Sequence, residues 1–230
     1  MGMRFESQAA GLQRRGVAVA AEVRFPNWNG LYRAGFKRVL DVVAVLAAAP
    51  IVLPVILMLA LLVSLDGHSP IYRQERLGRG GRKFLLWKLR TMVPDADARL
   101  AQHLLDHPEA RCEWDRFQKL TNDPRITPLG RFLRRSSLDE LPQLWNVLRG
   151  DMSLVGPRPM MPQQRALYPG HAYFMLRPGL TGLWQVSERN GSTFAERAKY
   201  DADYERSVSL ATDVRVLAET VGVVLRGTGQ

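Results

Sequence analysis

The sequence predicts a mixed α and β (α+β) fold that is held at a membrane by an N-terminal re-entrant helix. Three observations lead to this prediction. Residues 42–65 form a run without a charged side chain, and two short strand-like segments joined by a glycine-rich turn follow it. Helical spacing dominates much of the remaining chain, and its aromatic residues indicate amphipathic helices at a membrane interface.

The composition of the 230 residues limits the classes of protein to consider. The length suits one domain of ordinary size with an added segment, and it allows a sizeable core. With 32 Lys and Arg against 22 Asp and Glu, the formal net charge is +10. This excess favours anionic partners, which include nucleic acid, phosphorylated ligands and an anionic membrane surface. The single cysteine, Cys112, excludes an internal disulfide framework and a cysteine-based zinc site, and it is typical of a reducing compartment.

The uncharged run is the first element after residues 1–30, which show no sustained periodicity and are expected to be mobile or on the surface. It exceeds the roughly 20 helical residues that cross a bilayer core. Pro50 and Pro54 fall near its middle, where each removes a backbone donor and obstructs a straight helix. Basic residues mark the cytoplasmic side of a membrane segment. Here they flank both ends: Arg33, Lys37 and Arg38 before the run, and Arg73, Arg76, Arg79, Arg82 and Lys83 after it.

These flanks favour a re-entrant helix that breaks near Pro50 and Pro54 and returns to the face from which it entered. A single spanning helix with a kink is an alternative, because membrane helices tolerate proline. A core helix of a soluble protein is a third interpretation, although the run is long and uniformly apolar for one. We therefore assign residues 1–30 to an N-terminal segment, 31–68 to the re-entrant membrane helix and 69–230 to a cytosolic domain.

The first part of that domain alternates between strand and helix signals. Residues 71–78 and 83–92 are predicted as two strands joined by the turn RGGR. Residues 95–120 have helical spacing, with an interruption near Pro108. In the next segment Thr127 can cap a helix whose first position is Pro128.

The C-terminal half continues with a short helix in residues 141–150, which Gly150 ends. Residues 152–156, MSLVG, are predicted as a buried strand. The aromatic, proline and glycine residues of 166–186 give no clear assignment, and part of this segment is expected at the membrane interface, where Trp and Tyr are enriched. Residues 194–227 close the chain with helical spacing.

Two adjacent carboxylates, Asp139 and Glu140, lie where the helix of residues 141–150 begins. A helix N-terminus presents unpaired N–H groups and a partial positive charge, which keep a carboxylate ionised and attract phosphate. An ionised carboxylate can act as a nucleophile on phosphorus, and its neighbour can hold Mg²⁺. Ordinary helix capping is the alternative, and it is the more common role of such a pair.

Basic residues near this pair favour a site that handles phosphate. Arg158 lies between two prolines that fix its backbone, and arginine is the natural bidentate partner of phosphate. Further positive charge in polar or turn-rich segments comes from Lys88, Arg90, Arg125, Arg134 and Arg189. A chain this basic also carries arginines on a solvated, membrane-facing surface, which accounts for most of them.

No common soluble catalytic motif competes with this site. The sequence lacks the phosphate-binding loop GxxxxGK[ST], the zinc motif HExxH and the nucleophile motif GxSxG. His103 and His107 have the i, i+4 spacing of helical metal ligands, but Pro108 follows at once and no third ligand is apparent. The histidines are therefore predicted as surface residues.

Several long motifs, in order, resemble the bacterial sugar transferase family, which comprises monotopic polyprenyl-phosphate phosphoglycosyl transferases. They are KRVLD before the apolar run, FLLWKLRTM, TNDPRITPLGRFLRRSSLDELPQLWNVLRGDMSLVGPRP and LRPGLTGLWQV. The resemblance extends from about Leu31 to the C-terminus. It implies the minimal catalytic unit of the family, with residues 69–230 as the catalytic domain and without the additional N-terminal membrane helices of larger members.

The resemblance implies roles for individual residues. Asp139 matches the nucleophile of the family's Asp-Glu pair, and Glu140 matches its Mg²⁺-associated partner. Arg158 and Arg134 match basic residues of the substrate site, while Asp201 matches an acidic position to which no definite role is carried over. Arg189 lies in SERNG, a segment in which many members have glycine before the arginine and this chain has glutamate.

The implied enzyme transfers sugar-1-phosphate from a nucleoside-diphosphate sugar, expected to be a UDP-sugar, to polyprenyl (undecaprenyl) phosphate at the cytosolic face of the bacterial inner membrane. The implied mechanism is ping-pong, through a phosphosugar bound to Asp139, and a homodimer is compatible with it. A non-catalytic, membrane-attached scaffold of a polysaccharide complex is the alternative, against which the intact Asp-Glu pair argues. A nucleic-acid-binding protein is disfavoured by the apolar run and by the lack of a recognised binding motif.

Overall fold

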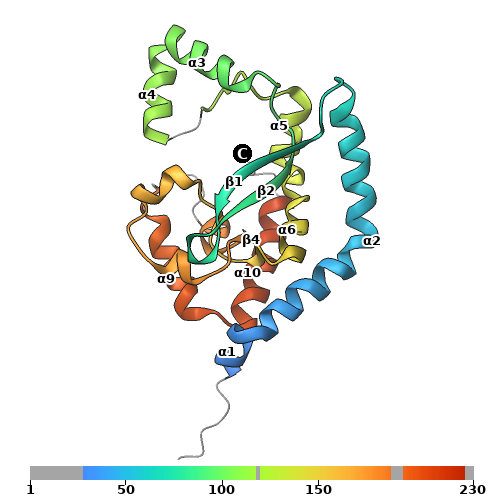
Figure 1. Ribbon diagram of the computed structural model, residues 1–230, viewed down its shortest axis with the longest axis vertical. Coiled ribbons are helices and arrows are strands. Elements are labelled where there is room, and N and C mark those ends of the chain that lie inside the picture. Colours follow the sequence, from blue (N-terminus) through green and yellow to red (C-terminus); the bar gives the residue numbers. More distant parts are fainter. Residues whose placement is uncertain (1–27, 118–119, 188–193, 226–230) are drawn as a thin grey trace, which may run out of the picture.

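The computed structural model describes residues 28–117, 120–187 and 194–225, and the structural statements that follow concern these residues. It confirms a mixed arrangement of helices and small sheets. The chain starts with the short helix α1 (Trp28–Leu31) and a π-helical turn (Tyr32–Phe36). The long helix α2 (Lys37–Ser64) then runs along one side of the molecule, as Figure 1 shows. The N-terminal segment predicted for residues 1–30 lies almost entirely outside the described residues.

The predicted apolar helix is present, but as one helix rather than two. Helical structure continues through Pro50 and Pro54, and Figure 1 shows that α2 bends partway along its length. Proline is the usual cause of such a bend, because it removes a backbone hydrogen bond and its ring presses on the preceding turn. Residues 32–64 are long and apolar enough to cross or enter a membrane. Large apolar side chains remain exposed along α2: Val39, Val43, Leu46, Ile51, Leu53, Leu57, Met58, Leu61 and Leu62.

Both ends of α2 are fixed to the rest of the chain by polar contacts. Near its start, the guanidinium of Arg38 donates to the carbonyl oxygens of Val147 and Leu148, the second at 2.7 Å. At its end, Arg90 donates to the carbonyl oxygen of Val63 at 3.0 Å. Apolar side chains of α2 pack against the same body between these points.

The predicted hairpin is confirmed, with strands β1 (Ile71–Leu77) and β2 (Lys83–Leu89) pairing antiparallel. The turn η2 (Arg79–Gly81) connects them through Gly80 and Gly81, which both have positive φ. Directly opposed residues of an antiparallel pair share one face. Arg76 is opposite Phe84 and Tyr72 is opposite Lys88, so Arg76 and Lys88 lie on the same face of the hairpin.

The helices that follow the hairpin are close to their predicted positions. Helix α3 (Ala96–Asp106) and helix α4 (Pro108–Phe117) are separated at the expected proline. Helix α5 (Pro128–Arg135) begins as expected, since the hydroxyl of Thr127 accepts a hydrogen bond from the backbone N–H of Gly130 at 2.9 Å. The turn η3 (Leu138–Glu140) leads into helix α6 (Gln143–Arg149), which ends at Gly150 with φ of 88°.

The C-terminal part contains a second, smaller sheet and the last helices. Strand β3 (Ser153–Val155) is the predicted one, and it pairs in parallel with β4 (Gly179–Thr181). Short helical elements fill the segment that the sequence left unassigned: η4 (Pro162–Leu167), α7 (Ala172–Met175) and α8 (Leu183–Val186). The predicted helical spacing at the end corresponds to α9 (Arg197–Ser207) and α10 (Leu210–Leu225).

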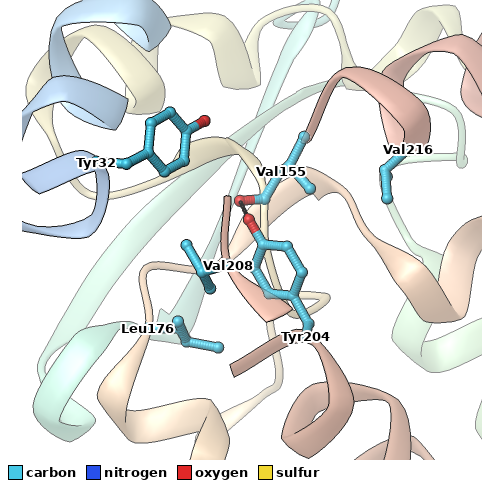
Figure 2. Close-up of a cluster of buried hydrophobic side chains, with 6 residues drawn as sticks. All are labelled: Tyr32, Val155, Leu176, Tyr204, Val208 and Val216. Atoms are coloured by element: carbon cyan, nitrogen blue, oxygen red, sulfur yellow. Dashed lines mark hydrogen bonds between the residues drawn. The ribbon is translucent and has the colours of Figure 1, made fainter. Parts of the chain in front are cut away.

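The core consists of four apolar clusters that join these elements. Figure 2 shows one of them, in which Tyr32, Tyr204 and Val216 come from three different helical elements. The hydroxyl of Tyr204 lies 2.6 Å from Oδ1 of Asp213 and 3.1 Å from the carbonyl oxygen of Val155. The hydroxyl of Tyr32 donates to the other oxygen of Asp213 at 2.6 Å. The π-helical turn that leads into α2 is thereby connected to α9, α10 and β3.

Candidate active site

The carboxylate pair lies in the turn η3, directly before helix α6 rather than in its first turn. Ser137, just ahead of the pair, has φ of 57° and ψ of 18°, a left-handed conformation that is uncommon for a residue with a side chain. This residue turns the chain out of α5 and into η3. Asp139 is buried, with 6% of its surface exposed, and Glu140 is partly exposed.

Side-chain cations surround the pair. Nζ of Lys88 is 2.7 Å from Oε1 of Glu140 and 3.8 Å from Oδ2 of Asp139. Nη2 of Arg158 is 3.3 Å from the same Glu140 oxygen. Burial raises the pKa of the Asp139 carboxyl above its ordinary value, and Glu140 adds to this rise, whereas Lys88 and two arginines act against it. The side-chain cations therefore favour the ionised form of Asp139 against the effect of burial.

Glu140 lines a pocket of about 180 Å³ in which positive side chains outnumber negative ones, and Asp139, directly before it in the chain, is buried. Four cations and one carboxylate line it: Arg76, Lys88, Arg158, Arg197 and Glu140. They come from β1, β2, the segment after β3, the start of α9 and η3. An anionic ligand suits such a pocket, because charge-assisted hydrogen bonds to phosphate are among the stronger polar contacts.

A smaller cavity adjoins the first and shares Arg158 and Arg197 with it. Asp201 lines this cavity, buried, and its Oδ2 accepts a hydrogen bond from the hydroxyl of Tyr168 at 2.9 Å. Burial raises the pKa of Asp201 to about 7, although the hydrogen bond from Tyr168 and the charge of Arg197 work in the opposite direction. The guanidinium carbon of Arg197 lies 4.0 Å from the ring centre of Trp184, which holds the group flat against an aromatic wall.

The structure brings together most of the residues that the sequence singled out. Asp139, Glu140, Lys88 and Arg158 meet at one site, and Asp201 lies in the adjoining cavity. Arg134 is also near, because its charge counts among the influences on the Asp139 carboxyl, and its Nε donates to the hydroxyl of Thr91 at 2.9 Å.

Two further predicted phosphate ligands are engaged in the fold. Arg90 does not line the pocket; it contacts the end of α2 and forms an ion pair with Asp66 at 2.6 Å. Arg125 is buried against Asp123, with Nη2 to Oδ2 at 2.6 Å. Arg189 lies outside the described residues.

Sequence analysis did not single out Arg76 and Arg197 as members of the site. For Arg76 a signal was available: once the hairpin and its turn are accepted, counting alternate residues from Lys88 places Arg76 on the same face. For Arg197 the only local signal is its position one helical turn before Asp201.

The donor groups of the site suit Mg²⁺ only in combination with a substrate. No group of three or more His, Cys, Asp or Glu side chains that could hold a metal occurs among the described residues. Mg²⁺ is often held by one or two carboxylates together with waters and substrate phosphate oxygens. The adjacent carboxylates of Asp139 and Glu140, of which Glu140 lines a cationic pocket, match that arrangement.

Comparison with known proteins identifies the family. The model of the family described as bacterial sugar transferase matches residues 32–227, which include every element from the π-helical turn to α10. The chain belongs to the bacterial sugar transferase family. Its relatives include a protein of Erwinia amylovora named UDP-galactose-lipid carrier transferase, which is 49% identical over 195 residues, covering 84% of this chain and 41% of that protein.

Other relatives match over a larger share of their own length. The exopolysaccharide production protein ExoY of Rhizobium meliloti is 42% identical over 196 residues, covering 84% of this chain and 87% of ExoY. The UDP-glucose:undecaprenyl-phosphate glucose-1-phosphate transferase of Caulobacter vibrioides is 40% identical over 200 residues, covering 82% of this chain and 69% of that enzyme. The chain thus spans about two fifths of the length of some relatives and most of others.

Proposed function

We propose that the protein is a phosphoglycosyl transferase that moves sugar-1-phosphate from a nucleoside-diphosphate sugar, in particular a UDP-sugar, to polyprenyl phosphate. The names of the relatives support this reaction and a role in exopolysaccharide production, and we place the reaction at the first membrane step of such synthesis. The observation that carries the proposal is the pair Asp139 and Glu140, both within 4 Å of Lys88 at a cationic pocket, in a chain with an apolar helix long enough to enter a membrane.

The first step we propose is attack by a carboxylate oxygen of Asp139 on the phosphorus that bears the sugar. The new bond joins Asp139 oxygen to phosphorus, and the bond to the bridging oxygen of the diphosphate breaks. The nucleoside monophosphate leaves with that oxygen and its electron pair. Lys88 and Arg158 would reduce the repulsion between the carboxylate and the diphosphate, since preorganised charges act most strongly in a partly dehydrated site.

The second step is attack by a phosphate oxygen of the lipid on the same phosphorus. The bond from phosphorus to Asp139 breaks, the carboxylate is restored, and the product is a polyprenyl diphosphate sugar. Glu140 is the residue that would hold Mg²⁺ on the phosphate oxygens during both steps. The bound ion would supply positive charge to the oxygens of the diphosphate.

The contacts of α2 support a re-entrant arrangement at the membrane. At 1.5 Å per residue the helix is about 42 Å long, enough to span a bilayer if it stood upright. Its start contacts α6 through Arg38 and its end contacts β2 through Arg90. In a spanning arrangement these two ends would lie on opposite sides, and the polar groups of the attached domain would enter the hydrocarbon. We therefore propose that both ends lie on the cytosolic face of the inner membrane.

The reaction is tested by leaving out the lipid. Purified protein in detergent, mixed with a UDP-sugar labelled in the sugar phosphate, should release about one equivalent of UMP and retain the label on the protein. Asp139→Asn keeps the size of the side chain and removes the nucleophile, so it should abolish both release and retention. Asp203→Asn is the matched control, because Asp203 is an exposed carboxylate on α9 that should not affect either result.

Two results would contradict parts of the proposal. UMP release that needs the lipid, with no label on Asp139, would show direct transfer and leave the overall reaction standing. No turnover with any of several UDP-sugars and polyprenyl phosphate would favour the non-catalytic scaffold.

A further inference from the structure

Two arginines of the pocket, Arg76 and Arg197, are charged, largely buried and without an ion pair among the described residues. The Nε atoms of both are buried and have no hydrogen-bond partner there. The carboxylate that follows Arg197 by one turn, Asp201, is hydrogen-bonded to Tyr168 instead. By contrast, Arg90 and Arg125 each have a carboxylate within 2.6 Å.

Such an arrangement costs stability unless something compensates for it. A buried cation loses its hydration, and a partner normally restores the lost interaction energy. Burial and the charge of Arg158 lower the pKa of both Arg76 and Arg197 to about 10, so both remain charged at neutral pH while repelling Arg158. The described residues give Arg76 one neutral hydrogen-bond partner, the Oε1 of Gln74 at 2.5 Å, and give Arg197 two aromatic rings, but they give neither arginine a paired carboxylate.

The cations of the pocket differ in their partners. Lys88 and Arg158 lie 2.7 Å and 3.3 Å from Oε1 of Glu140 and so are engaged by the carboxylate pair. Arg76 and Arg197 line the same pocket but form no ion pair among the described residues. Arg158 also lines the adjoining cavity together with Arg197.

A diphosphate has two phosphate groups that share one oxygen, which matches two adjoining cationic groups. If the sugar-bearing phosphorus lies at Asp139, the other phosphate must extend away from it along the pocket. Arg197 is suited to receive it, because stacking on Trp184 and Phe194 fixes the plane of its guanidinium and so the direction of its donors.

We propose that Arg76 and Arg197 form a second phosphate subsite, which binds the nucleoside-side phosphate of the donor and stabilises it as the leaving group. The inference rests on the proposed function for the identity of the donor. The same chemistry would also suit the phosphate of the polyprenyl acceptor, so the test compares the two sources.

The experiment measures binding of inorganic pyrophosphate, UMP and a short-chain polyprenyl phosphate to the full chain in detergent by calorimetry. Arg76→Gln and Arg197→Gln should each weaken binding of pyrophosphate and UMP by roughly ten- to hundredfold, the effect of losing a hydrogen bond to a charged group. Binding of the lipid phosphate should change less than threefold. Arg82→Gln is the matched control, because Arg82 is an exposed arginine of the same hairpin outside the pocket and its loss changes the net charge equally.

Melting temperature separates this role from a structural one. Without ligand, both variants should melt within a few degrees of the parent, because each loses a cation that has no carboxylate partner. A fall of roughly ten degrees in both would show that the guanidinium groups serve the fold and would overturn the inference. So would unchanged binding of pyrophosphate and UMP, or a loss confined to the lipid phosphate.

Turnover of UDP-sugar and polyprenyl phosphate by the parent protein is measured on the same preparation. Turnover together with arginine-independent UMP binding would overturn the subsite and leave the proposed function standing. Arginine-dependent pyrophosphate binding without any turnover would support the anion subsite and refute the proposed function.

Discussion

Replacing Asp201 with asparagine should change how the stability of the protein depends on pH. The carboxyl is buried in the cavity beside the active-site pocket, and burial raises its pKa to about 7 from an ordinary value of 3.8. Tyr168 donates a hydrogen bond to it at 2.9 Å, and an asparagine oxygen can accept the same bond. Asp201→Asn therefore removes the ionisation while keeping the main contact.

The sign follows from the direction of the shift. Because the folded protein holds this proton more tightly than the unfolded chain, ionisation of Asp201 destabilises the folded state as pH rises from about 4 to about 7. A shift of about three pH units corresponds to about 4 kcal/mol, with a slope of about 1.4 kcal/mol per pH unit within that interval. The variant should match the parent near pH 4 and exceed it in stability at pH 8.

The assay is thermal unfolding in detergent at pH 4 to 8, followed by intrinsic fluorescence. For a chain of this length, about 4 kcal/mol corresponds to a difference of roughly ten degrees in melting temperature. Other groups also titrate over this range, so the measured quantity is the difference between the variant and the parent. Asp203→Asn, on the same helix but exposed, should show no such pH dependence. A parent-to-variant difference for Asp201→Asn that stays constant across the range would refute the reasoning.

Three further predictions concern the site, the membrane helix and the core. Arg158→Ala should lower turnover by about 10²-fold or more with little change in melting temperature, and a folded, nearly fully active variant would make this residue merely structural. Replacing both Pro50 and Pro54 with alanine should let some molecules adopt a spanning topology. Cysteines introduced at positions 36 and 70 and labelled from each face of the membrane would detect this topology. In the parent, both positions should be labelled from one face only. Asn146→Ala should lower the free energy of unfolding by roughly 2 to 4 kcal/mol. The fully buried amide accepts a hydrogen bond from a backbone N–H of β2 and donates one to a carbonyl oxygen of β2, and the variant loses both. Denaturant titration measures the loss.

The elements that the sequence predicted well are those with local signals. The hairpin followed from a glycine-rich turn between two strand-like segments, and the start of α5 followed from Thr127 and Pro128. Strand β4 could not be found in this way, since Gly179–Thr181 lies among the aromatic, proline and glycine residues that give no clear assignment. The position of β4 depends on close contact with a part of the backbone that is distant in the sequence. A Cβ added to Gly179 would lie 2.1 Å from the backbone nitrogen of Gly156.

Residues of the site could be predicted where their types alone, basic side chains together with two adjacent carboxylates, indicate phosphate chemistry. Lys88 and Arg158 meet the carboxylate pair as expected, although their roles with substrate stay predictions. Arg125, predicted as a phosphate ligand, forms an ion pair with Asp123, a carboxylate two residues away in the chain. Tertiary contacts decide whether an arginine pairs with a carboxylate of the fold or lines a pocket where it can bind a ligand. A single sequence does not show these contacts.

The turn η3 lets the carboxylate pair lie close to α2 and still face polar side chains. A 3₁₀ turn has three residues, so its consecutive side chains point about 120° apart. Leu138 packs into the cluster that contains Leu59 and Val63 of α2, while Asp139 and Glu140 turn toward Lys88. The residue before the proposed nucleophile thus fixes the position of Asp139 relative to α2. The packing of Leu138 against α2 accounts for the strained left-handed Ser137, rather than a longer loop, between α5 and the pair. A short turn keeps the carboxylates at a fixed position relative to α2, whereas a longer loop would not.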